Sequence, residues 1–454
     1  MGAVSMEYTI WNPQAECMDR EALEQVQLER LQMTLNLTAR NVDLYARRFR
    51  EIGLLPEDVR QLPDLAGIPF TTREDLIQAY PYGLFAVPLR SVVQLRLAAS
   101  SVDPIVVGYT RQDLRMWTEL MCRAMAAADV GRTDIIQVAF HYSQFPGAFT
   151  FNQGAESLGA VLTPAATVSG ALQLKMMQDF RSTVLASTPA FALNLLKTLQ
   201  EAGNGDADGR DTVGQEGAAG LHLRVGLFGP EALQPQVRAL LEQGLGLRAY
   251  SVYGVAEMIE PALAAECSQQ SGMHLAEDHF YIEIIDPQTG DTLPPGEEGE
   301  VVVTSLTTQG YPLIRFRTGD ISRLHLAACP CGRLSARLSP VFRRTDAAVS
   351  IRGIRLHPGL VEQVVREIAP ESPDFRLLIQ TVHGLGDQVE LILAHSEAGP
   401  LSGATLETLR GQLRRVLGLG LRLRQAPQKR LPLAGLTYKT TFQEREVPAS
   451  ELPF

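Results

Sequence analysis

YSVYGVAEMIEPALAAEC (residues 250–267) and, after four further residues, GMHLAEDHFYIEIIDPQTGDTLPPGEEGEVVVTSLTTQGYPLIRFRTGD (residues 272–320) decide the fold. A strand-like run ends at Tyr253-Gly254. Apolar runs and turn residues then predict an antiparallel meander over residues 279–306, which closes on Ile314–Asp320 after a Thr-Gly bend. The middle of the chain is therefore expected to be rich in β-structure.

Two charged side chains stand at the end of this stretch. Ionised Asp is an acceptor only, so Asp320, after a tight glycine turn, is well placed to accept two hydrogen bonds from a sugar diol. Arg317 carries a guanidinium that suits a phosphate. The pair predicts a nucleotide site, although an isolated Thr-Gly-Asp would favour an ordinary hairpin with a solvated Asp in its turn.

Four motifs of this region resemble the adenylate-forming enzymes, and most nearly the phenylacetate–coenzyme A ligases. They are Tyr253-Gly254 with Glu257, EDHFY at residues 277–281, GEEGE at 296–300 and IRFRTGD at 314–320. The resemblance is specific because separate motifs stand in the family's order, and it extends from about Leu31 to about Ile368.

The resemblance implies a set of nucleotide contacts. Tyr253 and Gly254 would border the adenine, as would the backbone of Gly229-Pro230-Glu231, a turn at the end of a strand-like run. Glu257 would be catalytic, serving a Mg²⁺ that bridges the phosphates. For Glu257, the alternative is a carboxylate stabilised by a helix dipole.

The loop that wraps the ATP phosphates in this family is altered here. The family's loop is rich in Ser, Thr and Gly and ends in Gly-Lys-Pro, so that backbone N–H groups reach the phosphates. Ser100 and Ser101 remain as hydroxyl donors, but Ala99 and Val102 replace glycines and Asp103 replaces the lysine. A carboxylate repels a triphosphate, and Val102 disfavours a positive φ.

Three interpretations of the altered loop stay open. The chain is a ligase whose phosphate loop works differently, a nucleotide-binding relative with little or no adenylation activity, or a paralogue that acts beside an intact partner.

Aromatic residues after residues 135–140, a strand-like run, are candidates for the acid pocket. In the family, the matching loop and the helix after it line the acyl pocket. Tyr142, Phe145, Phe149 and Phe151 could form a flat slot for an aromatic ring. A cluster of core aromatic residues explains them equally well.

Four residues around the meander are candidate metal ligands. Cys267 is followed by His274, and Cys329-Pro330-Cys331-Gly332 lies beyond the Asp320 turn. Three thiolates and one imidazole suit tetrahedral zinc, which we expect to be structural because protein fills all four positions. The C-x-C spacing is less diagnostic than C-x-x-C, so the alternative is a buried Cys267 with two free cysteines on a loop.

A change of domain is expected near residue 345. RRTD at residues 343–346 resembles the family's hinge Gly-Arg-x-Asp, in which Arg344 and Asp346 match and an arginine replaces the glycine. The resemblance implies that Arg344 contacts the nucleotide and that a small domain rotates about this hinge between two half-reactions. The predicted domains are residues 1–344 and 345–454.

The C-terminal part is expected to be a small α+β unit. Residues 360–368 and 406–416 predict helices, and residues 375–379 and 388–395 predict strands. The resemblance implies a catalytic lysine near the end of the chain, for which Lys439 is the candidate. A solvated surface lysine is the alternative.

Elsewhere, helical periodicity predicts one long helix over residues 21–49 and a capped helix over 74–79 that starts at Thr71-Thr72 with Glu74. Short β-like runs reached through helical segments indicate a mainly parallel sheet. These runs are residues 135–140, 159–164, 183–187 and 223–228.

Composition limits the class of protein. A length of 454 residues allows two or three domains, and the net charge of −10 argues against non-specific binding of nucleic acid or anionic membranes. The sequence offers no run of about 18 apolar residues and no secretory signal. Five cysteines do not make a disulfide scaffold, so we expect a soluble cytoplasmic protein with reduced thiols.

The expected fold is α/β: a large N-terminal domain with mainly parallel sheets and a β-rich subregion, and a small α+β C-terminal domain. The resemblance implies ATP-dependent activation of an aryl or arylacetic acid, followed by transfer to coenzyme A with release of AMP. The expected partners are the carboxylic acid, ATP and coenzyme A, with Mg²⁺ and structural Zn²⁺, and a homodimer is one candidate assembly. The alternatives are a non-catalytic nucleotide-binding partner or regulator, and an enzyme that uses an amine or a carrier protein as acceptor.

Overall fold

The computed structural model describes most of the 454 residues. The described residues are 9–98, 105–140, 142, 147–165, 168–203, 220–341, 343–345, 349–351, 354–356, 358–372, 375–382, 386–395, 399–417 and 420–427.

The chain divides into two compact units. The first comprises Met1–Ala99, Pro104–Pro189 and Ala218–Thr345. The second comprises Ser100–Asp103, Ala190–Gly217 and Asp346–Phe454.

Two helices replace the single N-terminal helix expected over residues 21–49. Helix α2 (Arg20–Asn41) begins at the N-cap Asp19 and ends because Val42 takes an extended backbone, with φ −121° and ψ 108°. Helix α3 (Asp43–Ile52) then runs to Gly53, whose φ of +67° suits glycine. The single-helix prediction was wrong because Val42, a β-branched residue, is buried at the corner between the two helices.

The predicted cap at Thr72 is confirmed, with a different partner. Helix α4 (Arg73–Gln78) starts at Thr72, which exchanges hydrogen bonds with Asp75 instead of Glu74. The other short helices of the N-terminal region are α1 (Pro13–Glu16) and the 3₁₀ turns Pro56–Asp58, Leu62–Gly67 and Leu89–Ser91.

A hairpin and a long helix lead into the main sheet. Strands β1 (Val92–Ala98) and β2 (Ile105–Thr110) pair antiparallel, and α5 (Arg111–Ala127) follows directly. Asp113 caps α5 and also accepts hydrogen bonds from the backbone N–H of Gln309 (2.7 Å) and Gly310 (3.0 Å). This carboxylate therefore fixes the hairpin against the loop that precedes the last strand of the meander.

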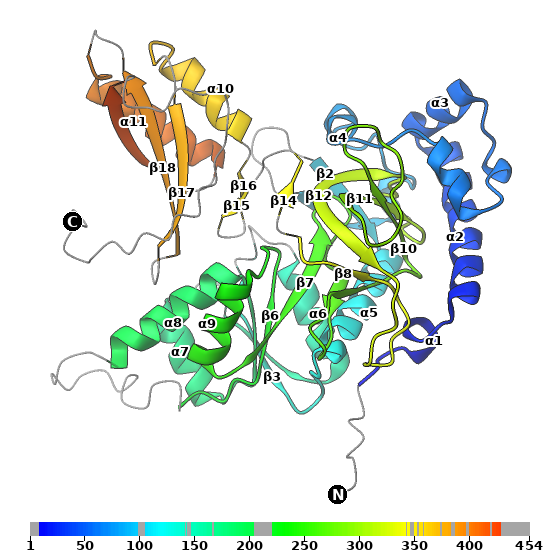
Figure 1. Ribbon diagram of the computed structural model, residues 1–454, viewed down its shortest axis with the longest axis horizontal. Coiled ribbons are helices and arrows are strands. Elements are labelled where there is room, and N and C mark those ends of the chain that lie inside the picture. Colours follow the sequence, from blue (N-terminus) through cyan, green and yellow to red (C-terminus); the bar gives the residue numbers. More distant parts are fainter. Residues whose placement is uncertain are drawn as a thin grey trace, which may run out of the picture. The chain divides into compact units, whose positions relative to one another are not determined.

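The main sheet has twelve strands and is parallel in one half. The inner parallel strands Val184–Ser187 and Val225–Phe228 are apolar and buried, as expected for strands with helices on both faces. Figure 1 shows α7 and α9 on one side of these strands and α5 and α6 on the other. The elements are β3 (Ile135–Val138), α6 (Ala148–Leu158), β4 (Val161–Pro164), α7 (Gly170–Asp179), β5 (Val184–Ser187), β6 (Val225–Phe228), α9 (Pro235–Leu245) and β7 (Arg248–Val255).

The other half of the sheet is antiparallel and contains the predicted meander, which is confirmed. Its order from the parallel half outward is β7-β8-β9-β13-β12-β11-β10, with β14 paired to β12. The strands are β8 (Ile259–Glu266), β9 (Met273–Leu275), β10 (Phe280–Ile285), β11 (Glu298–Ser305), β12 (Phe316–His325), β13 (Arg337–Leu338) and β14 (Arg343–Arg344). The sheet is therefore mixed, and one core of buried side chains serves both halves.

The second unit contains a three-stranded sheet with its own apolar core. The predicted helices and strands of this unit are present, and β19 was missed; it pairs parallel with β18. The elements are α8 (Pro189–Gly203), β15 (Val349–Ile351), β16 (Ile354–Leu356), α10 (Pro358–Ile368), β17 (Phe375–Val382), β18 (Gly386–His395), α11 (Gly403–Leu417) and β19 (Arg422–Pro427).

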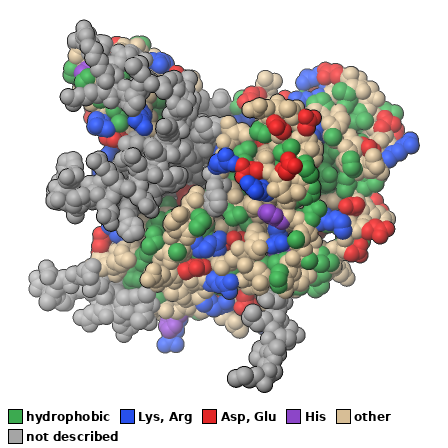
Figure 2. Space-filling view, in the orientation of Figure 1, with side chains coloured by type: hydrophobic (Ala, Val, Ile, Leu, Met, Phe, Trp, Pro, Cys, Tyr) green, Lys and Arg blue, Asp and Glu red, His purple; other side chains and the backbone are tan. Residues whose placement is uncertain are grey.

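The surface of the described part is mixed in charge. Figure 2 shows acidic and basic side chains interspersed on the face that it presents. None of the helices among the described residues combines the length and the apolar character that a membrane span requires.

Candidate nucleotide site and metal centre

Three predicted nucleotide contacts meet between β7, β12 and β14; we call Tyr253, Asp320 and Arg344 the nucleotide cluster. Tyr253 Oη donates to Asp320 Oδ2 at 2.6 Å, and the Arg344 guanidinium pairs with Asp320 Oδ1. Burial, and then the Asp320 charge, raise the pKa of Tyr253 well above its usual value, so this phenol keeps its proton and donates. Both oxygens of Asp320 thus have a protein partner, but an ionised carboxylate has about four acceptor positions and retains capacity for a diol.

The backbone around Asp320 is held as firmly as its side chain. Thr318 Oγ1 donates to Val301 O (2.7 Å) and accepts from the Asp320 N–H (3.0 Å). Arg344 Nη2 donates to Thr318 O at 2.8 Å, and β14 pairs Arg344 with Asp320 in register. The first half of the predicted hinge is therefore part of the sheet that carries the site.

The two predicted adenine-side turns lie at neighbouring strand ends. Gly229-Pro230-Glu231 follows β6, and Tyr253-Gly254 lies just before the last residue of β7, which pairs parallel with β6. A Cβ on Gly229 would lie 2.5 Å from Val252 O, and one on Gly254 would lie 2.4 Å from Ile259 O. Both positions therefore require glycine because another backbone strand approaches them closely. A crevice at the carboxyl ends of parallel strands is where α/β proteins bind ligands.

Glu257 is buried and faces a cation that the sequence reasoning missed. Its side chain is 4% exposed, and Arg73 Nη1 lies 3.0 Å from its Oε1. Arg73 is the first residue of α4. Its position at the start of a capped helix gave no signal that it would reach Glu257, which lies 184 residues away.

Arg317, predicted to contact phosphate, is engaged with protein groups. Its Nε donates to Glu300 Oε2 at 3.0 Å, and its Nη2 donates to Pro287 O at 2.9 Å. Glu300 also accepts from the Gly319 N–H at 3.1 Å, so this ion pair braces the turn before Asp320. To contact a phosphate, Arg317 would have to give up its hydrogen bond to Glu300 or to Pro287 O. Its role as a phosphate ligand therefore stays a prediction.

The aromatic candidates separate into two groups. Tyr142 and Phe149 meet edge to face at 4.9 Å, and Tyr142 Oη donates to Asn152 Oδ1 at 3.0 Å. Phe149 is 44% exposed, so its ring is accessible to a ligand. Phe151 is fully buried and stacks on Phe140 at 5.1 Å, which places it in the core.

Four candidate site residues lie outside the described residues. They are Ser100, Ser101, Phe145 and Lys439.

The four predicted metal ligands come together; we call Cys267, His274, Cys329 and Cys331 the cysteine cluster. Their ligand atoms all lie within 4.8 Å of one another, and all four residues are buried. Cys267 Sγ and Cys329 Sγ are 3.7 Å apart, close to the ~3.8 Å expected for two thiolates on one tetrahedral zinc with Zn–S bonds of about 2.3 Å. Cys331 Sγ lies 3.3 Å from His274 Nε2.

The surroundings of the cysteine cluster suit a cation. Interaction with the Cys267 thiol, and with His274, lowers the pKa of Cys331, whereas the bond to Cys331 raises the pKa of Cys267 and burial raises that of Cys329. One of the three close sulfurs is thus favoured as thiolate, the form that binds metal. His274 Nδ1 lies 3.1 Å from Ser335 Oγ, a contact that orients the ring so that Nε2 faces the sulfurs. The donor set fits zinc.

Residues 9–17 form hydrogen bonds with the loop that carries Cys329 and Cys331. Arg333 Nε donates to Glu16 Oε2 at 2.5 Å, and both side chains are buried. Arg333 Nη2 donates to Thr9 O at 2.7 Å, and the Leu334 N–H donates to Glu16 O at 2.9 Å. Residues 9–17 therefore cover the cysteine loop.

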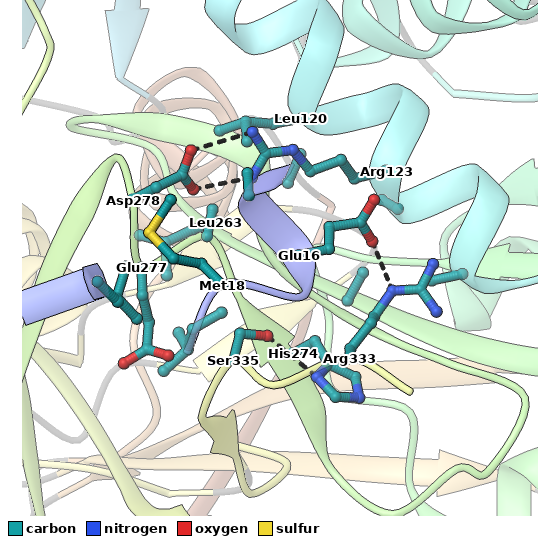
Figure 3. Close-up of a pocket in the computed structure, with 18 residues that line it drawn as sticks. Glu16, Met18, Leu120, Arg123, Leu263, His274, Glu277, Asp278, Arg333 and Ser335 are labelled. Atoms are coloured by element: carbon teal, nitrogen blue, oxygen red, sulfur yellow. Dashed lines mark hydrogen bonds and ion pairs between the residues drawn. The ribbon is translucent and has the colours of Figure 1, made fainter. Parts of the chain in front are cut away.

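A cavity of about 40 Å³ lies beside this contact. Figure 3 shows it between the Arg333–Glu16 pair, the Arg123–Asp278 pair and His274 with Ser335. This volume holds a few waters and is far below the roughly 300 Å³ or more of a small-molecule site. It is therefore a small solvent pocket beside the cysteine cluster and is too small for a substrate.

Comparison with known proteins identifies the family. Residues 121–311 match the family model described as AMP-binding enzyme. The chain is 34% identical over 390 residues to the phenylacetate-coenzyme A ligase of Thermus thermophilus, covering 86% of this chain and 85% of that one. It is 36% identical over 373 residues to that of Pseudomonas putida, covering 82% and 81%.

A solved structure agrees in fold. The crystal structure of a 2-hydroxyisobutyryl-CoA ligase, in complex with 2-HIB-AMP and CoA, matches with a TM-score of 0.84 at 24% identity. The match covers 96% of this chain and 92% of that one. The resemblance of the sequence motifs and the predicted fold class are both confirmed. The chain belongs to the phenylacetate–coenzyme A ligase family of AMP-binding enzymes.

Proposed function

We propose that the chain catalyses ATP-dependent activation of an aryl or arylacetic acid and transfers the acyl group to coenzyme A. The acid carboxylate attacks the α-phosphorus of ATP, an acyl-adenylate forms and pyrophosphate leaves. The thiol of coenzyme A then attacks the acyl carbonyl, a thioester forms and AMP leaves with the electrons of the broken bond. Such chemistry depends on positioning and charge and needs no protein nucleophile.

The convergence of Tyr253 and Asp320 in a chain of this family carries the proposal. Asp320 would accept hydrogen bonds from the ribose diol, with Tyr253 and the glycine turns at 229 and 254 bordering the adenine. Arg344 orients Asp320, because its guanidinium pairs with Asp320 Oδ1 and is itself held on Thr318 O.

Mg²⁺ would be served by Glu257, the predicted catalytic carboxylate. Mg²⁺ prefers oxygen ligands and is commonly bound through one or two carboxylates together with substrate phosphates. Glu257 supplies one such carboxylate, in a buried position where Arg73 fixes its orientation. When bound, the ion would neutralise charge on the departing pyrophosphate.

Zinc would be held by the cysteine cluster and would be structural. The four donors match tetrahedral zinc in kind and in spacing, and protein supplies all of them, which leaves no position for a substrate. The ion would join the Cys267 strand end to the loop of Cys329 and Cys331.

The acid would bind beside Tyr142 and Phe149. An aromatic acid fits because the exposed Phe149 ring and the edge-on Tyr142 ring offer a flat apolar surface with one polar group. Phe145 and Lys439 stay predictions for the pocket and for the carboxylate contact, as do the rotating hinge, the homodimer and the cytoplasmic location.

The test begins with calorimetric titration of ATP with Mg²⁺ and, separately, of AMP. Pyrophosphate release with a panel of aryl acids follows, and then thioester formation with coenzyme A against amine and carrier-protein acceptors. We expect pyrophosphate release that Asp320→Ala abolishes, and a coenzyme A thioester as product.

A second candidate function is a non-catalytic nucleotide binder that acts as a partner or regulator. Asp103, in place of the family's lysine, favours it. AMP binding without pyrophosphate release, even after Asp103→Lys with glycines restored at 99 and 102, would support this candidate and reject the ligase.

A further inference from the structure

The small cavity beside the cysteine cluster is walled in part by the segment that precedes α2. Ala15, Glu16 and Met18 of this segment line it, and Figure 3 shows Glu16 and Met18 around it. Of the four residues of the cysteine cluster, all of which the structure describes, only His274 lines the cavity. The cavity therefore connects the inner side of this segment with the imidazole of the cluster.

Arg333 links the same segment to a sulfur of the cluster. Its backbone N–H and its guanidinium both interact with the Cys331 thiol. The guanidinium also donates to Glu16 Oε2 at 2.5 Å and to Thr9 O at 2.7 Å. Burial alone would lower the pKa of Arg333, but the charge of Glu16 and the bond to Cys331 raise it. Groups that hold a metal ligand in this way affect how tightly the metal is bound.

Residues 9–17 are attached to the rest of the first unit mainly by polar contacts. The main apolar core of the described residues includes none of them, and their helix α1 has only four residues. Asn12 Nδ2 donates to Glu119 Oε1 on α5 at 3.0 Å. The buried Glu16–Arg333 pair is the charge-assisted contact of the set. A segment with few buried apolar contacts can open locally while the sheet stays folded.

We propose that residues 9–17 form a strap that opens locally and sets the rate at which zinc leaves the cysteine cluster. The Glu16–Arg333 ion pair is the contact that holds the strap closed. Opening exposes the cavity and the His274 imidazole to water, which replaces a ligand of the ion, and it frees the Arg333 side chain that supports Cys331. This inference rests on the proposed zinc site, since it assumes that the ion is bound there.

The experiment measures the zinc content of the full chain by elemental analysis and then follows zinc transfer to an excess of the chromogenic chelator 4-(2-pyridylazo)resorcinol. We expect one zinc per chain in wild type and in Glu16→Gln, because the substitution leaves all four ligands in place. Release from Glu16→Gln should be about 10- to 100-fold faster, as for loss of one hydrogen bond between charged groups. Hydrogen exchange of the amides of residues 9–17 should accelerate by a similar factor.

Three further variants make the result specific. Thr9→Val and Asn12→Ala remove weaker contacts of the strap, with Asp129 and Glu119, so each should speed release less than Glu16→Gln does. Glu283→Gln breaks the buried ion pair of Glu283 with Arg315. Because Glu283 lies on β10, three strands from β13 in the sheet, this control should lower Tm without faster zinc release.

Two outcomes would overturn the strap. One is an unchanged rate of zinc release in Glu16→Gln. The other is equally fast release from Glu283→Gln, which would show that zinc leaves only when the whole unit unfolds. A wild-type chain that contains no zinc and takes up none when zinc is added would reject the zinc site itself, and the strap with it.

Discussion

The nucleotide cluster and the cysteine cluster differ in the kinds of side chains that they bring together. In the nucleotide cluster, unlike groups meet: a phenol and a guanidinium both bind the Asp320 carboxylate. In the cysteine cluster, like groups meet, and four electron-pair donors lie within 4.8 Å of one another. A nucleotide must therefore share partners that already exist in the first cluster, whereas the donor set of the second suits a metal cation. The first cluster is expected to govern binding and the second to govern stability.

Breaking the cysteine cluster should have the largest effect. We expect one zinc per chain by elemental analysis, and Cys331→Ser should lose it and lower Tm by about 5–10 °C, because metal binding contributes directly to folding. Cys122→Ser is the matched control, since Cys122 is buried but lies outside the cluster. A zinc-free protein whose Tm is insensitive to Cys331→Ser would contradict the metal centre.

Asp320→Ala tests the nucleotide cluster directly. It should weaken AMP binding about 100-fold, measured by calorimetry, because two charge-assisted hydrogen bonds to the ribose are lost. Asp286→Ala, in an exposed turn of the same meander, should leave AMP affinity unchanged. Wild-type affinity in Asp320→Ala would remove Asp320 from the ribose site.

Glu257→Gln separates metal-assisted chemistry from nucleotide binding. Pyrophosphate release should fall about 10- to 100-fold because the carboxylate charge for Mg²⁺ is lost, whereas a glutamine can still accept from Arg73. The affinity for AMP should change little, because AMP lacks the β- and γ-phosphates. Equal loss of both would show that Glu257 acts through the fold.

Phe149→Ala should have the smallest effect. The KM for an aryl acid should rise about 5- to 10-fold while Tm stays nearly constant, because the ring is partly exposed and contributes little to the core. Phe151→Ala, two residues along the same helix and fully buried, should instead cost about 3–5 kcal/mol of stability. An unchanged KM in Phe149→Ala would place the acid elsewhere.

Features set by neighbouring residues could be predicted from the sequence. The meander follows from period-two patterns and turn residues, and the cap at Thr72 follows from local chemistry. The approach of the two cysteine segments was expected because both flank the same meander. The glycines at 229 and 254 stand where a Cβ would strike another strand.

Features set by distant contacts could not be predicted. No pattern in the neighbouring residues indicates that the helix ends at Val42. Its extended backbone depends on the burial of its side chain at the corner between α2 and α3. Arg73 gave no sign of reaching Glu257 across 184 residues. Arg96 on β1 is buried because the aromatic rings that it contacts come from β2 and α5. Such partners are chosen by the tertiary structure, and sequence patterns do not record them.

The hydrogen bonds between residues 9–17 and the loop that carries Cys329 and Cys331 also affect the order in which the chain can fold during synthesis. Glu16 and Arg333 are 317 residues apart, so a ribosome adding about 5–20 residues per second takes roughly 15–60 s to produce the second after the first. Until then Glu16 has only its local hydrogen bond from the Asn12 N–H, and its second carboxylate oxygen lacks the arginine partner. Residues 9–17 can bond to Glu119 and Asp129 early in synthesis, but a chain cut short before residue 329 would lose their bonds to Arg333 and Leu334.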